Sequence, residues 1–155
     1  MRLLIIGNSG SGKSTLARQA ATTERVPHLE LDSIVWEPHQ IAVARPLDAV
    51  HADLDAFIAE HPAWVIEGCD GDLAERALPT CTELVFMNPG VDVCTANNRR
   101  RPWEPHKYDS AADQESKLSF LLDWVASYYT RDDARSYAFH RKLFDGFTGA
   151  KREQR

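Results

Sequence analysis

The sequence predicts an α/β fold in which parallel strands alternate with helices along most of the chain. Short apolar runs with the composition of buried strands recur, and segments with helical periodicity lie between them. The first run leads through a glycine-rich loop directly into a helix, an order typical of phosphate-binding parallel sheets. The chain has 155 residues, 43% of them hydrophobic, so we expect residues 1–155 to form one compact domain.

The first strand and helix, Arg2–Ile6 and Ser14–Glu24, flank the most specific motif of the chain. Residues 7–14 read G-N-S-G-S-G-K-S and fit the pattern G-x-x-x-x-G-K-[ST]. Glycines let backbone N–H groups turn inward around an anion, a lysine adds positive charge, and a hydroxyl can reach Mg²⁺. A nucleoside triphosphate site is therefore predicted, with a glycine-rich turn that binds nothing as the alternative. Its residues are Gly7, Asn8, Ser9, Gly10, Ser11, Gly12, Lys13, Ser14 and Thr15.

Two further strands are predicted before residue 70, with one helix between them. The segment His28–Asp32 alternates as a strand does, and Ala63–Ile66 suits a buried strand. Pro46 opens a helix with an amphipathic pattern, and this helix stops before Pro62. Residues 34–45 show no periodicity, so we expect a functional loop there.

A fourth buried strand, Glu83–Met87, begins the second half of the chain. A helix is predicted over about Val91–Arg101, and Pro102 ends it. Residues 102–108 are too rich in proline for a regular element. We interpret about 99–115 as a flap or lid.

Two more helices are predicted near the C-terminus. The first is long and amphipathic, with apolar positions at Leu118, Leu121, Leu122, Val125, Tyr128 and Tyr129. Thr130 is expected to cap the second, with Asp133 reaching back to the start of the helix. Residues 149–155 contain no apolar run, so no fifth strand is predicted.

The composition argues against several classes of protein. A net charge of −5 does not suit broad binding to nucleic acid or to an anionic membrane, although residues 99–101 form a local basic patch. No apolar stretch is long enough to span a bilayer, and no signal segment precedes the first strand. Three widely spaced cysteines fit reduced thiols. We expect a cytoplasmic protein, monomeric or homodimeric, without membrane association; the charge disfavours a nucleic-acid partner but leaves one open.

Four segments carry a likeness to a known family: IIGNSGSGKSTLA, LELDSIVWEP, WVIEG, and LVFMNPG leading into NNRRR. Through them the chain resembles the adenylate-kinase-like P-loop kinases, and most closely the FlaR-like "DNA topology modulation protein" branch. The resemblance implies a three-layer αβα sandwich with a parallel sheet in the order 2-3-1-4. Nucleotide would lie at the carboxyl ends of the strands. The resemblance also implies ATP or GTP with Mg²⁺, and a small-molecule acceptor.

The chain departs from this group in two places. Nucleoside monophosphate kinases follow the third strand with D-G-x-P-R, whereas this chain reads E-G-C-D-G at residues 67–71. The arginine that grips the acceptor's phosphate is therefore absent, and Arg45 or Arg76 is a candidate substitute. Without a fifth strand, the nucleotide base would need another site, for example one formed by the late helices.

The motif and the resemblance together suggest roles on the nucleotide side. Lys13 is expected to neutralise the β and γ phosphates. Ser14 is expected to hold Mg²⁺, with Glu67 as the Walker-B-like acid acting through water. The alternative for Glu67 is a strand-end carboxylate stabilised by nearby loop amides.

On the acceptor side, Asp32 would orient or deprotonate a hydroxyl group. A plain turn or helix cap is the alternative. Arg99, Arg100 and Arg101 match arginines that related kinases close over the transferred phosphate, although cations at a helix C-terminus are favourable in any case. Loop side chains are a further hypothesis for the acceptor pocket: Trp36, His39, Trp103, His106, Lys107 and Tyr108.

The predicted function is ATP- and Mg²⁺-dependent phosphoryl transfer to a small molecule, of the adenylate-kinase-like or shikimate-kinase-like kind. One alternative is a nucleotide-binding regulatory module that hydrolyses nucleotide slowly. A polynucleotide 5′-hydroxyl kinase is a third possibility, against which the net negative charge weighs.

Overall fold

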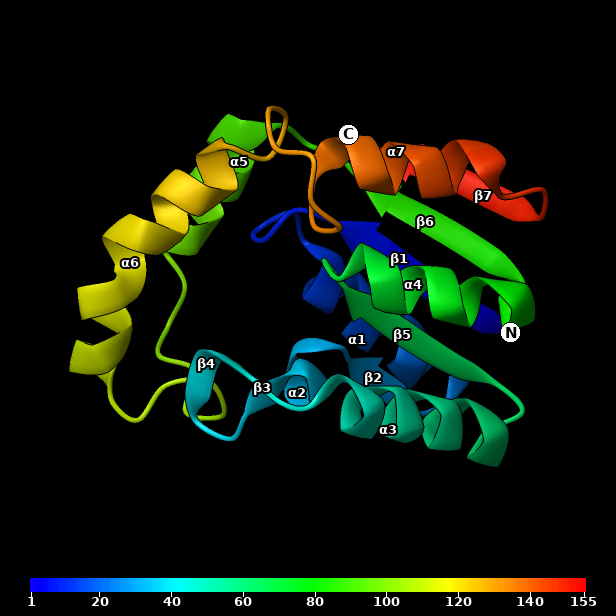
Figure 1. The fold of residues 1–155 in the computed structure, drawn as a ribbon. Coiled ribbons are helices and arrows are strands. Elements are labelled where there is room, and N and C mark those ends of the chain that lie inside the picture. The colour runs from blue at the N-terminus through cyan, green and yellow to red at the C-terminus, as the bar shows by residue number, and fades with distance from the viewer.

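The computed structural model describes the chain from Met1 to Arg155, apart from the side chains of residues 41 and 42. Its centre is a parallel five-stranded sheet in the order β2-β5-β1-β6-β7 (Figure 1). The strands of this sheet are β1 (Arg2–Gly7), β2 (His28–Glu30), β5 (Trp64–Gly68), β6 (Glu83–Met87) and β7 (Ala150–Gln154). The helices are α1 (Lys13–Glu24), α2 (Asp32–Val35), α3 (Leu47–Glu60), α4 (Gly71–Ala77), α5 (Val91–Arg99), α6 (Ala111–Ala126) and α7 (Tyr137–Gly146), with a 3-10 turn at Leu78–Thr80.

Helices cover both faces of the sheet because the central strands are apolar on both sides. Leu4 and Ile6 of β1 belong to one buried cluster, which α3, α4 and α7 close. Leu3 and Ile5 belong to a second cluster, formed with α1 on the opposite face. This alternation is the physical reason that β1 reads as a continuous apolar run. The predicted α/β sandwich is confirmed.

The strand order of the first four predicted strands is also confirmed, but the missing fifth strand is a wrong prediction. Strand β7 pairs with β6 along its whole length, from Ala150 beside Glu83 to Gln154 beside Met87. It lies at the edge of the sheet and is largely exposed. Backbone hydrogen bonds to β6 therefore hold a segment that has no apolar pattern, which is why residues 149–155 carry no strand signal.

Two local predictions are corrected. Residues 34–45 are not an irregular loop: after α2 they form an antiparallel hairpin of β3 (Trp36–Glu37) and β4 (Gln40–Ala44). Helix α7 does not start from Thr130. Its cap is Ser136, whose hydroxyl accepts from the backbone N–H of Phe139. The carboxylate of Asp133 instead accepts from the backbone N–H of Arg135.

Beyond the carboxyl ends of the strands stand α5 and α6, and the hairpin lies across from them (Figure 1). The predicted flap joins these two parts. Residues 101–107 form no regular helix or strand, and Tyr108 makes a single bridge to Gln40 of β4. In the described part of the chain, no helix is both long enough and apolar enough to cross a membrane.

Candidate functional site

The loop between β1 and α1 has the backbone conformation that a phosphate-binding loop needs. Gly10 and Gly12 adopt positive φ angles of 78° and 94°, which other residues rarely reach. Gly12 is the N-cap of α1, and no side chain caps this helix. The first N–H groups of α1 therefore stay free for an anion.

Helix α5 braces the outer side of this loop, through two asparagines that sequence reasoning missed. The side-chain amide of Asn97 donates to the carbonyl of Gly10 at 2.8 Å. The hydroxyl of Ser9 donates to the side-chain oxygen of Asn98 at 3.1 Å. A β-carbon on Gly10 would overlap the carbonyl oxygen of Cys94. The N-N pair before the arginine run was the available signal for this contact.

Polar atoms inside the loop fit an anionic ligand. The ammonium of Lys13 is buried and donates to the carbonyl of Asn8 at 2.8 Å, which leaves further donor capacity. The hydroxyl of Ser11 is buried without a hydrogen-bond partner in the described structure, so it can donate to a ligand. Hydroxyl and amine donors around a positively charged helix terminus suit a polyphosphate.

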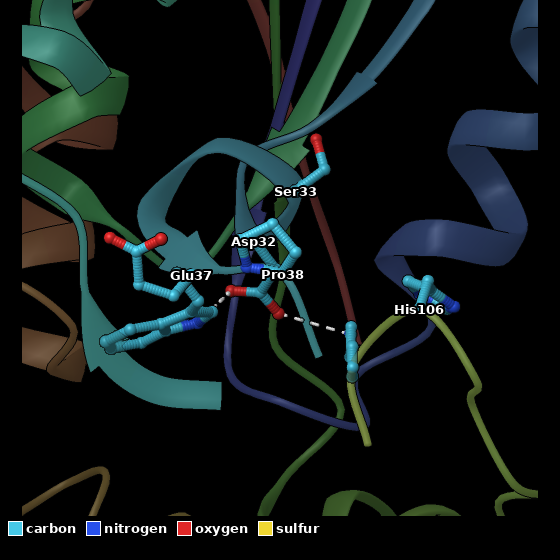
Figure 2. Close-up of a pocket in the computed structure, with 7 residues that line it drawn as sticks. Asp32, Ser33, Glu37, Pro38 and His106 are labelled. Carbon is cyan, nitrogen blue, oxygen red and sulfur yellow. Dashed lines mark hydrogen bonds and ion pairs between the residues drawn. The ribbon is translucent and has the colours of Figure 1, made fainter. Parts of the chain in front are cut away.

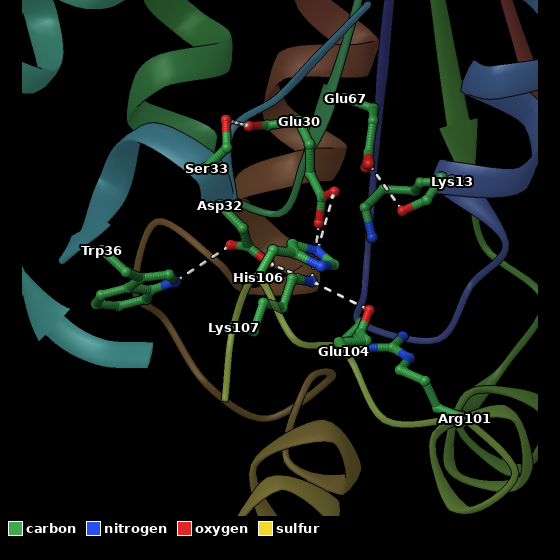
Figure 3. Close-up of polar contacts among 12 residues, drawn as sticks. Lys13, Glu30, Asp32, Ser33, Trp36, Glu67, Arg101, Glu104, His106 and Lys107 are labelled. Carbon is green, nitrogen blue, oxygen red and sulfur yellow. Dashed lines mark hydrogen bonds and ion pairs between the residues drawn. The ribbon is translucent and has the colours of Figure 1, made fainter. Parts of the chain in front are cut away.

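Ser14 and Glu67 form the candidate metal site. The Ser14 hydroxyl donates to Oε1 of Glu67 at 2.7 Å (Figure 3). Glu67 is the second-last residue of β5, beside β1, and is only 1% exposed. This burial raises the pKa of Glu67 above the ordinary value. A hydroxyl and a carboxylate are hard oxygen ligands of the kind Mg²⁺ uses together with water and phosphate. Among the described residues, no group of three or more His, Cys, Asp or Glu side chains could hold a metal.

Asp32 lies on the same edge of the sheet, at the start of α2. Its carboxylate accepts from the indole N–H of Trp36 at 3.3 Å and lies 3.2 Å from the ammonium of Lys107. Burial alone would raise the pKa of Asp32, but the adjacent Lys107 charge and hydrogen bond hold it below the ordinary value. Asp32 is therefore ionised at neutral pH.

Lys107 is the centre of an ion-pair cluster that sequence reasoning did not foresee. Besides Asp32, its ammonium lies 2.8 Å from Glu30 and 3.6 Å from Glu104 (Figure 3). Burial works against the ammonium, yet these carboxylates raise the pKa of Lys107 above its ordinary value. These ion pairs therefore hold the flap against the carboxyl end of β2.

A small cavity of about 30 Å³ lies beside Asp32, enough space for about one water molecule (Figure 2). Its walls come from three segments: Asp32, Ser33, Trp36, Glu37, Pro38, His106 and Lys107. Three of the loop residues predicted for an acceptor pocket therefore line one cavity: Trp36, His106 and Lys107. His39 and Trp103 do not line it and instead bond to backbone carbonyls of Pro105 and Tyr108.

The three candidate arginines have different surroundings. Arg99 and Arg100 are exposed, and Arg100 donates to the side-chain oxygen of Asn97 at 3.0 Å. Arg101 lies 3.5 Å from Glu104 and is the one of the three joined to the Lys107 cluster (Figure 3). The structure thus brings Arg101, but not its two neighbours, to the Lys107 cluster beside Asp32.

The two arginines considered as substitutes for the absent acceptor arginine are both held at α3. Arg45 bonds to the carbonyl of Ile34 and to Asp53, and Arg76 forms a double hydrogen bond with Asp55. Neither lines the cavity beside Asp32.

A buried hydrogen-bonded pair, Tyr128 and His140, contacts the backbone that follows β5. His140 of α7 contacts the Tyr128 hydroxyl at 2.6 Å and the Cys69 carbonyl at 2.8 Å. Burial lowers the pKa of His140 to about 4 and raises that of the Cys69 thiol to about 12. Both groups are neutral at pH 7, and the contact between His140 and the Cys69 carbonyl fixes the backbone that follows Glu67.

No family model matches the sequence, and a search of curated proteins finds no match. Two solved structures are similar to the chain in fold. A gluconokinase from Sinorhizobium meliloti 1021 has a TM-score of 0.48 and 16% identity over 98% of this chain and 81% of its own. A shikimate kinase from Acinetobacter baumannii, solved with shikimate, has a TM-score of 0.43 and 17% identity over 92% of this chain and 90% of its own. At such scores and identities, neither likeness identifies a function for this chain.

Proposed function

We propose that residues 1–155 act as an ATP- and Mg²⁺-dependent kinase domain that phosphorylates a small-molecule acceptor. The observation that carries this proposal is the meeting of three features at one edge of the sheet. The glycine loop with Lys13 follows β1, the Ser14–Glu67 pair lies at the end of β5, and Asp32 follows β2. Open α/β sheets bind ligands at this edge.

On the nucleotide side, the chain contributes charge and donors. Lys13 and the first N–H groups of α1 would hold the phosphates, while Ser14 and Glu67 would hold Mg²⁺. A bound nucleotide would supply the phosphoryl group, and Mg²⁺ would offset the negative charge of its phosphates. Phosphoryl transfer needs little else from the protein beyond alignment of the acceptor.

On the acceptor side, Asp32 would accept a hydrogen bond from the hydroxyl to be phosphorylated, and would take up its proton. An ionised carboxylate is required for this role, and the lowered pKa of Asp32 supports it. Arg101, from the flap, would add positive charge near the transferred group, with Arg99 and Arg100 available if the flap moves.

We propose that the chain belongs to the FlaR-like branch of the adenylate-kinase-like kinases, that it works in the cytoplasm, and that it uses ATP or GTP. The N-N-R-R-R run supports the branch, because its asparagines brace the loop that would hold the phosphates.

A regulatory nucleotide-binding module is the second candidate, and one observation favours it. Lys107 of the flap pairs with Asp32, and the cavity beside them has a volume of only about 30 Å³. In this arrangement the acceptor side is closed by the chain itself. Such a protein would bind nucleotide tightly and turn it over slowly.

Calorimetry with Mg²⁺ and a nonhydrolysable ATP analogue tests the nucleotide site. Binding is expected for the wild type, with a loss of about 100-fold or more in Lys13→Met, because a buried charge-assisted contact disappears. The exposed Lys142 supplies the matched control, Lys142→Met, which should bind normally. A well-folded wild type that binds neither adenine nor guanine nucleotide refutes the proposal.

Acceptor-dependent ADP formation separates the two candidates. In a screen of small alcohols, a kinase releases ADP rapidly with one chemical class, whereas a regulatory module binds nucleotide without acceptor-stimulated turnover. Once an acceptor is found, Asp32→Asn should lower kcat by about 100-fold to 10,000-fold while nucleotide affinity stays the same. Full turnover in Asp32→Asn would show that Asp32 serves only the local turn.

A further inference from the structure

His28 lies on the same face of the sheet as Glu67, the acid of the candidate metal site. In the parallel pairing of β2 with β5, His28 lies beside Val65 and Glu30 lies beside Glu67. Side chains alternate between the two faces of a strand, so His28 and Glu67 both point to the face that α1 covers. The imidazole therefore approaches the Glu67 carboxylate from β2, the edge strand, whereas Ser14 approaches it from α1.

The Nε2 atom of His28 is a buried polar group that lacks a partner. It makes no hydrogen bond among the described residues, although 22% of the whole side chain is exposed. Nε2 lies 4.0 Å from Oε1 of Glu67, which is too far for a hydrogen bond. Native proteins pair nearly all buried polar groups, because an unpaired group has lost its water and gained no bond in return. A short movement of either side chain would complete this pair.

The two oxygens of the Glu67 carboxylate have different surroundings. Oε1 accepts from the Ser14 hydroxyl at 2.7 Å, and it is also the oxygen that faces Nε2 of His28. Oε2 makes no hydrogen bond among the described residues. Two donors at Oε1 would fix the orientation of the carboxylate and leave Oε2 for the water shell of Mg²⁺. Carboxylates at metal sites are commonly held in this way by outer partners that do not touch the metal.

A neutral donor suits this position better than a charged one. Burial is the main reason that the pKa of His28 lies below its ordinary value; the Glu30 charge opposes this shift and the Arg18 charge adds to it. The imidazole is therefore neutral at pH 7, with one nitrogen that donates and one that accepts. A neutral N–H can orient Glu67 without cancelling the negative charge that attracts Mg²⁺, whereas an ammonium or guanidinium in the same place would cancel it.

We propose that His28 is a positioning residue for the metal site, whose Nε2–H donates to Oε1 of Glu67 when Mg²⁺ and nucleotide are bound. The imidazole touches neither the metal nor the nucleotide and acts only through the carboxylate. Together with Ser14, it holds Glu67 in the orientation that the water shell of the metal requires. The inference rests on the proposed kinase function, since it assigns a further residue to that same site.

The Mg²⁺ dependence of nucleotide binding tests this proposal. Calorimetry gives the affinity of the nonhydrolysable ATP analogue with Mg²⁺ and again with EDTA, and the ratio of the two affinities measures the contribution of the metal. His28→Met has no N–H donor and should lower this ratio about tenfold, the scale of outer-partner variants at metal sites. Its affinity for the analogue in EDTA should stay that of the wild type. His28→Gln places an amide N–H near the position of Nε2 and should restore the ratio to within about threefold of the wild type.

Two controls show whether the effect passes through Glu67. Glu67→Gln should lower the ratio at least as far as His28→Met does, and adding His28→Met to Glu67→Gln should lower it no further, because the two residues act as one unit. His51 lies on α3, which covers the other face of the sheet. His51→Met and His51→Gln should therefore leave the ratio unchanged.

The outcomes separate this inference from the proposed function. A well-folded wild type that binds the analogue equally with Mg²⁺ and with EDTA, or not at all, overturns the proposed kinase site. A normal ratio in His28→Met, where Glu67→Gln has lost the Mg²⁺ dependence, overturns the role of His28 alone. An equally low ratio in His28→Met and His28→Gln also overturns it, because the N–H donor would then have no effect.

NMR of the wild type decides the question if His28→Met does not fold. In the complex with the analogue, Nε2 of His28 should carry the ring proton, and its N–H signal should move downfield when Mg²⁺ is added, as a hydrogen bond to a carboxylate requires. An Nε2 without a proton, or a signal that Mg²⁺ leaves in place, would contradict the assignment.

Discussion

Acidification from pH 7 to pH 5 is expected to destabilise the protein through the buried imidazole of His140. Its Nε2 faces the Cys69 carbonyl, which can only accept, so this nitrogen carries the proton and Nδ1 accepts from the Tyr128 hydroxyl. The neutral ring is therefore fully hydrogen-bonded. A second proton would create a charge that forms no ion pair among the described residues, in a site that is 0% exposed.

The size of the effect follows from the lowered pKa of His140. In the unfolded chain the imidazole takes up a proton near pH 6.5, whereas the folded protein resists protonation until about pH 4. The contribution of His140 to the free energy of unfolding is thus fully present above pH 6.5. It is lost as the pH falls toward 4, because the unfolded state then binds more protons than the folded state. Each pH unit in this window costs about 1.4 kcal/mol, so about 2 kcal/mol is lost by pH 5.

Urea unfolding at pH 7, 6 and 5 measures this loss when the wild type is compared with His140→Gln. The variant is less stable at pH 7, but the difference between the two proteins should shrink by about 2 kcal/mol at pH 5. The comparison also removes the contribution of Glu67, whose raised pKa acts in the opposite direction. Parallel pH profiles for the wild type and His140→Gln would refute the reasoning.

Three further predictions concern the loop, the flap and the last helix. Gly10→Ala should lower the melting temperature and weaken binding of the ATP analogue by about tenfold or more, because alanine resists the positive φ and meets a backbone carbonyl; normal calorimetry would contradict this. Lys107→Met should raise the pKa of Asp32 above its ordinary value in an NMR titration, since burial is then opposed by less positive charge. An unchanged low pKa would exclude Lys107 as the cause of the lowered pKa of Asp32. Ser136→Ala should cost about 1 kcal/mol in urea unfolding and Thr130→Ala clearly less, because Ser136 caps α7; the reverse order would restore Thr130 as the cap.

The nucleotide side of the candidate site was predictable because its signals are local. The glycines, Lys13 and Ser14 follow one another in a fixed pattern, and the strand before them fixes where the loop points. Glu67 could be paired with Ser14 in advance because neighbouring parallel strands end at the same edge.

The acceptor side was only partly predictable. Asp32 was expected there, but its partner Lys107 lies 75 positions further along the chain and is brought to it by the flap. No sequence pattern predicted that Arg135 lies against Trp36, because this position depends on the packing of Ala134 against Gly71. Long-range contacts of this kind leave no spacing pattern in one sequence.

The sequence by itself determined the α/β architecture, the first four strands of the sheet and the glycine-rich loop between β1 and α1, because apolar periodicity and glycine placement act within a few residues. Only the tertiary structure decided that the polar β7 completes the sheet, that Ser136 rather than Thr130 caps α7, and that Asp70 holds an arginine beside Trp36. The physical reason is that edge pairing, capping geometry and ion pairs depend on which backbone groups and charges remain unpartnered once the core has packed.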